Sequence, residues 1–285
     1  MTEDTDPIET REWLEALDAV SNGSVDAAYT TSGYWQGKMA AAGLFAAVPF
    51  GPDVSEYLAW LFEGDGLKLW RELYAKHNLW VTPCLVIPPE ASGWFREPIE
   101  SLDQLKGLKM RIPGFGGEVL MRVGGTPVNI PGAELFTALQ SGTIDATEWV
   151  GPMNDLAFGL FRAAKYYYYP GWHEPGTTLE ALINKKAFTA LGKDLKSIVR
   201  NACKMVNQDM TTEFTAKNNA ALDTLVNKHG VKLRQFSDEV VNAIGAAAGD
   251  VMAADSSPGC PLPTSTRMES LAVAFTLSVT VKVTV

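Results

Sequence analysis

Arg111 and the pair Glu148-Trp149 follow apolar stretches that are typical of buried strands. An arginine at the end of a strand can hold a carboxylate ligand through two parallel hydrogen bonds. A surface arginine paired with an exposed acid fits the same pattern equally well. For Glu148 three roles stay open: a solvated acid at the rim of a sheet, a salt-bridge partner, or one oxygen ligand of a hard cation.

The segment 166–176 combines four consecutive tyrosines with Trp172, His173 and Glu174 between turn-forming prolines and glycines. Alternate residues of a strand face opposite sides, so the tyrosines must occupy two faces. Aromatic loops beside a cleft are typical of small-molecule sites, but a strand packed between two lobes would have the same composition. No Ser or Cys stands in a nucleophile setting, so a hydrolase triad has no support, and a lone histidine such as His173 is more often structural than catalytic.

The residues around Arg111 and Glu148 alternate between strand and helix patterns, at 108–112, 117–123, 126–130, 132–140 and 143–150. The order β-α-β-α-β predicts a parallel, doubly wound sheet. Ligands of such sheets bind outside the carboxyl ends of the strands. The predicted topology therefore places Arg111 and Glu148-Trp149 at a ligand cleft.

Other stretches complete the expected elements. An amphipathic helix pair or one long helix is expected at 53–77, a strand at 79–87, and helices at 185–229 and 238–254. The pattern then changes: 255–266 is rich in Pro, Ser and Thr, and 271–285 reads as an edge strand or an aggregation-prone extension.

A nine-residue motif occurs twice, as AVSNGSVDA at 19–27 and as ALQSGTIDA at 138–146. Each copy predicts the end of a helix, a glycine stop and the start of a strand. The chain has 285 residues, and a domain has roughly 150. The repeat and the length together favour two similar α/β lobes.

Composition excludes several classes of function. The net charge of −9 argues against nucleic acid or an anionic membrane as a partner, because both require a basic surface. Cys84, Cys203 and Cys260 are too few and too scattered for a disulfide framework or a zinc site. The glycines at 114–117 match neither a P-loop nor a dinucleotide fingerprint. Residues 1–12 carry no secretory signal.

Four motifs together resemble the substrate-binding proteins of tripartite ATP-independent periplasmic (TRAP) transporters, the DctP family. They are LKGLKMRIPG at 105–114, ALQSGTIDA at 138–146, EWVGPMND at 148–155 and the aromatic segment at 166–176. The last two are most similar to the branch that binds small 2-oxo or 2-hydroxy monocarboxylates. The resemblance covers about 13–254 and implies two α/β lobes, joined by a hinge, that close around a carboxylate in the periplasm.

The resemblance also implies roles for individual residues. Arg111 matches the carboxylate-clamping arginine, whereas Glu148 and the carbonyl of Trp149 match positions that hold a metal ion, Na⁺ or Ca²⁺, bridging protein and ligand. Glu90 stands where a glutamine ligand is expected, and Glu174 is a further oxygen donor. The residues expected to line the pocket are Tyr34, Trp35, Asn154 and His173. No organic cofactor is implied.

The chain departs from the family pattern at both ends and at Glu90. The signal peptide, first strand, helix and second strand of the family are missing, so the first lobe is expected to be truncated. The expected division is an incomplete first lobe at 1–85, a second lobe at 86–185, a helical segment at 186–254 and an atypical tail at 255–285. The extra charge of Glu90 leads to the hypothesis that the site prefers Ca²⁺ over Na⁺.

The sequence thus predicts a non-enzymatic periplasmic receptor that delivers a monocarboxylate such as pyruvate, 2-oxobutyrate or lactate to TRAP membrane subunits. One rival is a metal-dependent enzyme acting on the same acids, but no base stands apart from the ligand clamp. Another rival is a ligand sensor for a membrane receptor. The sequence leaves open which acid and which metal are bound, and whether the protein forms a homodimer.

Overall fold

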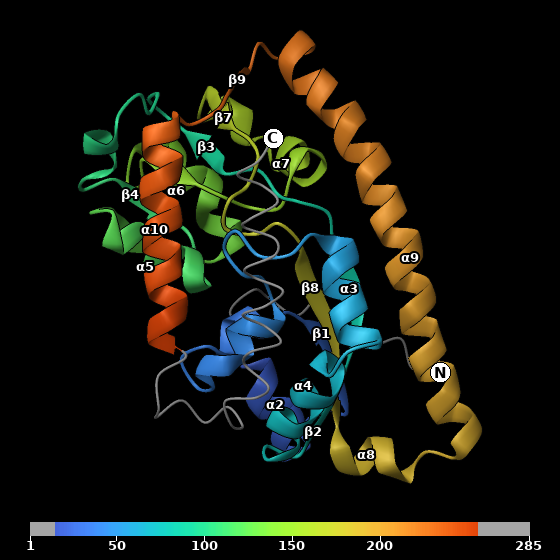
Figure 1. The fold of residues 1–285 in the computed structure, drawn as a ribbon. Coiled ribbons are helices and arrows are strands. Elements are labelled where there is room, and N and C mark those ends of the chain that lie inside the picture. Colours follow the sequence, from blue (N-terminus) through green and yellow to red (C-terminus); the bar gives the residue numbers. More distant parts are fainter. Residues whose placement is uncertain (1–14, 256–285) are drawn as a thin grey trace.

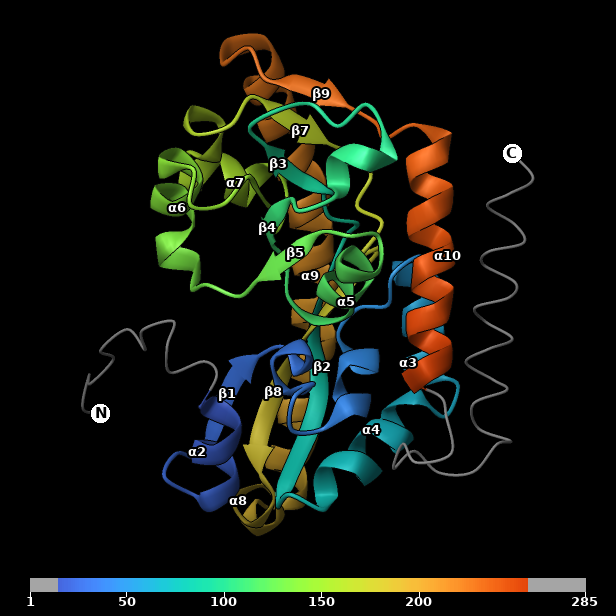
Figure 2. The same cartoon turned by 90° about the vertical axis from the view of Figure 1, so that its left-hand side faces the viewer.

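The computed structural model describes residues 15–255. Two β-sheets lie at opposite ends of the molecule, and one long helix runs past both of them (Figures 1 and 2). The α/β class predicted from the sequence is therefore confirmed.

The first sheet has three antiparallel strands in the order β1-β8-β2. They are β1 (Ala27–Thr30), β2 (Leu79–Ile87) and β8 (Thr177–Asn184). Around them lie α2 (Ala16–Asn22), α3 (Val54–Phe62), α4 (Gly66–Ala75), α8 (Lys185–Ala190) and the 3₁₀ turns η1 (Ser32–Trp35) and η2 (Ala40–Phe45). The segment 53–77 is thus a helix pair, and α3 begins at a capping box between Asp53 and Glu56.

The second sheet has six strands in the order β5-β4-β6-β3-β7-β9. They are β3 (Gly93–Phe95), β4 (Lys109–Arg111), β5 (Thr126–Val128), β6 (Ala146–Thr147), β7 (Tyr166–Tyr168) and β9 (Lys232–Arg234). The helical elements of this lobe are α5 (Gly114–Arg122), α6 (Leu135–Ser141), α7 (Pro152–Phe158), η3 (Leu102–Leu105), η4 (Gly132–Glu134) and η5 (Leu160–Arg162).

The predicted all-parallel sheet needs correction. The β-α-β-α-β segment does form parallel pairs, because β4 pairs in parallel with β5 and with β6. However, β3 inserts between β6 and β7 and runs antiparallel to both. The three residues of β3 lie outside any longer apolar stretch and so left no strand pattern in the sequence. Its pairing with β6 and β7 makes this sheet mixed.

The chain passes between the lobes more than once. From the second lobe it returns to the first as β8, which pairs with β1 and β2. The helix α9 (Lys193–Asp223) then packs on β2 and on α7, ends in the π turn η6 (Thr224–Lys228), and is followed by β9 and by α10 (Asp238–Asp255) beside α5. β8 falls within the predicted segment 86–185, and the predicted division into folding units stays a prediction.

The two copies of the nine-residue motif have the same local structure. α2 is followed by Gly23 at φ 86°, and α6 by Gly142 at φ 78°. In the first copy the Val25 N–H donates to the Ala19 carbonyl of α2 at 3.2 Å. In the second copy the Ile144 N–H donates to the Ala138 carbonyl of α6 at 3.3 Å. Their strands have different neighbours, because β1 pairs antiparallel with β8 and β6 pairs in parallel with β4. The helix–glycine–strand prediction is confirmed, and a duplication of whole lobes stays a prediction.

A disulfide joins Cys84 of β2 to Cys203 of α9, a bond that the sequence reading missed. The two cysteines are 119 residues apart in the chain, and only the packing of α9 across β2 brings them together. Cys260 and all but the first residue of the predicted tail 255–285 lie outside the described residues, as do residues 1–14. Within 15–255, no helix is both long and apolar enough to cross a membrane.

Candidate ligand- and cation-binding site

A cavity of about 400 Å³ is lined by strands of both sheets and by α9. Eight of the nine residues that the sequence suggested for the site line this cavity: Tyr34, Glu90, Arg111, Glu148, Trp149, Asn154, His173 and Glu174. The cavity therefore collects side chains that are up to 140 positions apart in the chain, and most of its polar groups come from loops that follow strands.

Arg111 and Glu148 lie side by side because their strands are parallel neighbours. Arg111 is paired in register with Thr147, and the Glu148 N–H donates to the Arg111 carbonyl at 3.2 Å. The Arg111 Nη1 donates to Glu148 Oε1, and only 4% of Arg111 and 2% of Glu148 is exposed. The guanidinium also lies over the Trp149 ring, 5.4 Å from its centroid.

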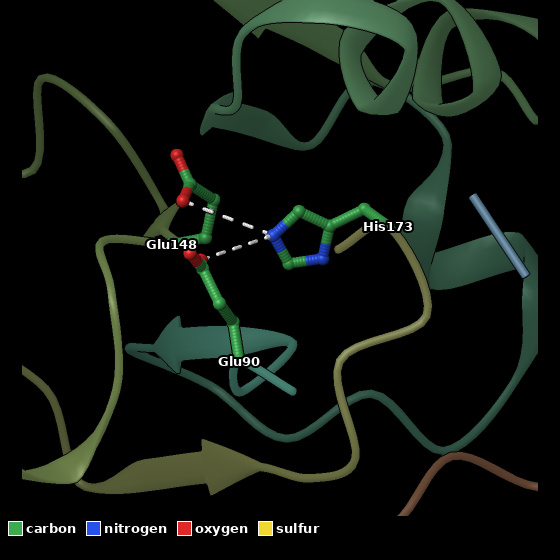
Figure 3. A group of neighbouring side chains, drawn as sticks. All are labelled: Glu90, Glu148 and His173. Carbon is green, nitrogen blue, oxygen red and sulfur yellow. Dashed lines mark ion pairs between the residues drawn. The ribbon is translucent and has the colours of Figure 1, made fainter. Parts of the chain in front are cut away.

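His173 faces two carboxylates. Its Nε2 lies 3.8 Å from Glu148 Oε2 and 4.0 Å from Glu90 Oε2 (Figure 3). All three residues are buried, and one ligand atom of each lies within 4.8 Å of the others. Neither ring nitrogen of His173 has a hydrogen-bond partner, nor does Glu90 Oε2. This group thus leaves buried polar atoms that need a partner.

Glu174 joins Glu90 through the hydroxyl of Thr177. The hydroxyl oxygen lies 3.0 Å from Glu90 Oε1 and also contacts Glu174 Oε2. The Glu90 N–H donates to the Glu174 carbonyl at 3.1 Å, which fixes the two segments together. Burial, then the nearby charges of Glu174 and Glu148, raise the pKa of Glu90 well above its usual range.

The donor set fits a hard cation. Three carboxylates, Glu90, Glu148 and Glu174, line one cavity with the single guanidinium of Arg111. Two buried oxygens there, Glu90 Oε2 and Asn154 Oδ1, lack partners. Na⁺ and Ca²⁺ take carboxylate and carbonyl oxygens as ligands, and an added positive charge would offset the excess of negative charge. Glu90, Glu148 and Glu174 could hold such an ion, with His173 as a neighbour on the same side.

The remaining predicted residues differ in position. Tyr34 lines the cavity, and burial raises its pKa. Trp35, which we expected to line the pocket, instead lies fully buried in the core of the first lobe, where its indole N–H donates to Glu180 at 2.9 Å. Adjacent residues of the η1 turn point in different directions, so Tyr34 faces the cavity and Trp35 the core.

One wall of the cavity is apolar, and the sequence analysis did not identify it. It consists of side chains from β2, β8 and α9: Leu85, Ile87, Leu179, Met210 and Phe214. The alternation of Leu85 and Ile87 on one face of β2 was the available signal, but the pairing with β8 and the crossing of α9 could not be read from it.

Two α/β lobes around a cavity with a buried arginine and several carboxylates define a class, the two-lobed binding proteins for small ligands. The family described as bacterial extracellular solute-binding protein, family 7 (DctP), matches residues 11–254. The chain belongs to this family, which confirms the resemblance seen in the sequence.

Individual relatives are similar over most of the chain. The monocarboxylate 2-oxoacid-binding periplasmic protein of Nostoc sp. is 41% identical over 238 residues, 84% of this chain and 65% of that protein. A TRAP periplasmic solute-binding protein from Pseudoalteromonas atlantica, crystallised with sodium and pyruvate, is 38% identical with a TM-score of 0.86. One from Colwellia psychrerythraea, with calcium and pyruvate, is 36% identical with a TM-score of 0.87.

Both crystal structures match 94% of this chain, which covers 80% of each of them. The chain spans about two thirds of the length of the Nostoc relative, 65%. The family consists of solute-binding proteins rather than enzymes, so the enzyme rival loses its support.

Proposed function

We propose that this protein is a periplasmic receptor of a TRAP transporter that binds a small 2-oxo or 2-hydroxy monocarboxylate together with Na⁺ or Ca²⁺. Arg111 holds the ligand carboxylate, and Glu90, Glu148, Glu174 and the Trp149 carbonyl hold the cation. The relatives crystallised with pyruvate and either sodium or calcium support this assignment, as does the 2-oxoacid-binding relative.

The observation that carries the proposal is the charge balance of the cavity. A clamp for one carboxylate needs a free cationic donor, and the Arg111 Nε is buried without a partner. Three carboxylates beside it would repel an anionic ligand, so a bound cation is required to bridge ligand and protein. Arginine and cation together then leave a site that accepts a monocarboxylate.

The two lobes supply the means of signalling occupancy. Because the cavity is lined from both sheets, a ligand held on Arg111 also contacts the first lobe and favours a closed arrangement. The closed shape would be recognised by the membrane subunits of the transporter. A ligand sensor would use the same site, so purified membrane subunits in a pulldown distinguish the two roles.

Isothermal titration calorimetry tests the binding function. Pyruvate, 2-oxobutyrate and lactate are titrated into protein that was stripped with chelator and transferred to a potassium buffer, and then again with Na⁺ or Ca²⁺ added. The proposal predicts micromolar or tighter binding, about 8 kcal/mol, only when one of the two cations is present. Equal binding with and without both cations would refute the bridging ion, and absence of binding in every buffer would refute the receptor.

A further inference from the structure

Asp155 is a buried carboxylate next to the site, with a role that the proposed function does not yet include. It lies in the first turn of α7 and is 1% exposed. Its Oδ2 accepts hydrogen bonds from Trp94 Nε1 at 2.9 Å and from the Tyr167 hydroxyl at 2.8 Å. Its Oδ1 accepts the backbone N–H groups of Val150 at 3.3 Å and of Gly151 at 3.1 Å. One oxygen thus faces the core and the other holds the loop between β6 and α7.

The bond from Val150 fixes the direction of the Trp149 carbonyl. The Val150 N–H and the Trp149 C=O belong to the same planar peptide group. Within 15–255 the cis peptide bond is Tyr169–Pro170, so the group at Trp149 is trans and its N–H and C=O point in opposite directions. A Val150 N–H held by Asp155 therefore aims the Trp149 carbonyl away from Asp155.

The opposite side of this loop is the cavity. Glu148, Trp149 and Val150 all line it, whereas Asp155 does not. The carbonyl that the resemblance assigned to the cation is thus oriented by a residue behind the loop.

Asp155 itself is held rigidly by its other partners. The rings of Trp94 and Tyr167 stack with centroids 4.2 Å apart, and both side chains are fully buried. Both rings come from neighbouring strands, β3 and β7. Two donors on a rigid sheet fix Oδ2, so the position of Oδ1, and with it the peptide plane, is set by the core of the second lobe.

The loop has no regular secondary structure to replace this contact. It follows the two-residue strand β6 and ends at Pro152, the first residue of α7. Without Asp155 the N–H groups of Val150 and Gly151 would lose an acceptor in a largely buried place, and the peptide would be free to turn towards another one.

We propose that Asp155 is a positioning residue that aims the Trp149 carbonyl into the cavity as an oxygen ligand of the cation. The inference rests on the proposed function, because it assumes a cation beside Glu148. Partners behind the ligands of a metal ion are known to change its affinity about 10–100-fold when they are removed.

Three variants separate positioning from general stability. Asp155→Ala removes both acceptor oxygens. Asp155→Asn keeps one oxygen for the two backbone N–H groups but disturbs the contacts to Trp94 and Tyr167. Tyr168→Phe removes the hydroxyl of a buried tyrosine on the same strand, β7, which bonds the backbone of Ile99 and not Asp155, so it is the matched control for damage to the core.

The measurement is the affinity for Ca²⁺ and for Na⁺ by calorimetry, without organic acid, beside the melting temperature of each variant. We expect Asp155→Ala to bind the cation about 10–100-fold more weakly, while Asp155→Asn and Tyr168→Phe melt earlier and keep the wild-type affinity within about threefold. If Asp155→Ala does not melt cooperatively, Asp155→Ser, whose shorter side chain cannot bridge both N–H groups, takes its place with the same expectation.

Two results would overturn the inference alone. In the first, Asp155→Ala melts earlier yet binds the cation like wild type, which would make Asp155 a purely structural residue. Equal losses in Asp155→Asn and Asp155→Ala would show that its charge matters and its orientation of the peptide does not. A wild-type protein that binds pyruvate but neither cation refutes the inference and the bridging ion, and one that binds nothing refutes the receptor as well.

Discussion

Arg111 and Glu148 form an ion pair inside the protein, at the carboxyl ends of two adjacent parallel strands. Burial of an ion pair costs desolvation energy that the pair itself barely recovers. The pair therefore does little for stability, and its use is to hold the guanidinium in one orientation. That orientation leaves the Arg111 Nε without a protein partner, so the arginine can hold a carboxylate of a ligand.

Removal of Arg111 should separate binding of the acid from binding of the cation. Arg111→Ala is expected to lose pyruvate affinity by at least about 100-fold, because two charge-assisted hydrogen bonds of ~1.5–3 kcal/mol each disappear. Ca²⁺ should still bind, since three carboxylates remain. Calorimetry with each ligand checks this, and Arg71→Ala, which removes an arginine packed on Trp80 in the first lobe, is the control. An unchanged pyruvate affinity in Arg111→Ala would show that Arg111 does not hold the ligand carboxylate.

Glu90 should set the preference between cations. Glu90→Gln removes one charge from the site, and a unit charge at ~4 Å contributes about 1–4 kcal/mol. We expect the ratio of pyruvate affinities in Ca²⁺ and in Na⁺ buffer to fall about tenfold or more. Glu180→Gln, which changes a buried glutamate that does not line the cavity, should leave the ratio unchanged. The hypothesis fails if the two variants give the same ratio as wild type.

Glu180 should make the first lobe less stable as pH rises. Burial raises the pKa of Glu180 to about 8, against the hydrogen bonds from Trp35 and Tyr74 that lower it. The unfolded chain loses this proton near the usual pKa of 4.5, whereas the folded protein keeps it. The stabilising effect is therefore complete below about pH 4.5 and is lost as pH rises to about 8.

Chemical denaturation of wild type and Glu180→Gln between pH 6 and 8 measures this effect. Burial also raises the pKa of Asp155, to about 6. Ionisation of Asp155 therefore lowers the free energy of unfolding as pH rises as well, but mostly below this window. We expect wild type to lose on the order of 2 kcal/mol across that window relative to the variant. If the free energies of unfolding of the two proteins change with pH in the same way, Glu180 is already ionised in the folded protein and the expectation is wrong.

The Cys84–Cys203 disulfide should stabilise the packing of α9 on β2. A bond that closes a loop of 119 residues restricts the unfolded chain, and removal of such bonds costs about 2–5 kcal/mol. We expect the double variant Cys84→Ser/Cys203→Ser to lose that amount in denaturant unfolding. Reduction of the disulfide should lower the free energy of unfolding of the wild-type protein by a similar amount. It should leave the free energy of unfolding of the double variant unchanged. A double variant as stable as wild type would contradict this account.

The apolar wall should favour ligands with an apolar tail. Each buried methylene contributes ~0.8 kcal/mol, roughly fourfold in affinity. We expect 2-oxobutyrate and 2-oxovalerate to bind more tightly than pyruvate, and Leu179→Thr to abolish the difference while pyruvate affinity is kept. Leu195→Thr, at an exposed position on α9, is the control. A wild-type protein that binds all three acids equally would exclude the wall as a ligand contact.

Local patterns predicted much of this fold and part of this site. The predicted strand 79–87 has the same bounds as β2, and the β-α-β-α-β segment carries Arg111 and Glu148 on neighbouring strands. The strand β3 left no pattern of its own, because its three residues lie outside any longer apolar stretch. The position of Trp35 in the core and the disulfide of Cys84 were missed for a different reason: both depend on the approach of β8 and α9, contacts distant in sequence that no local spacing encodes.

A crystal structure with pyruvate and Ca²⁺ would show whether the cation bridges protein and ligand, because anomalous scattering locates the cation. We expect Ca²⁺ with Glu90, Glu148, Glu174 and the Trp149 carbonyl at ~2.3–2.6 Å, and the pyruvate carboxylate on Arg111 and on the cation. Pyruvate bound without a cation, or a cation away from Glu148, would contradict it.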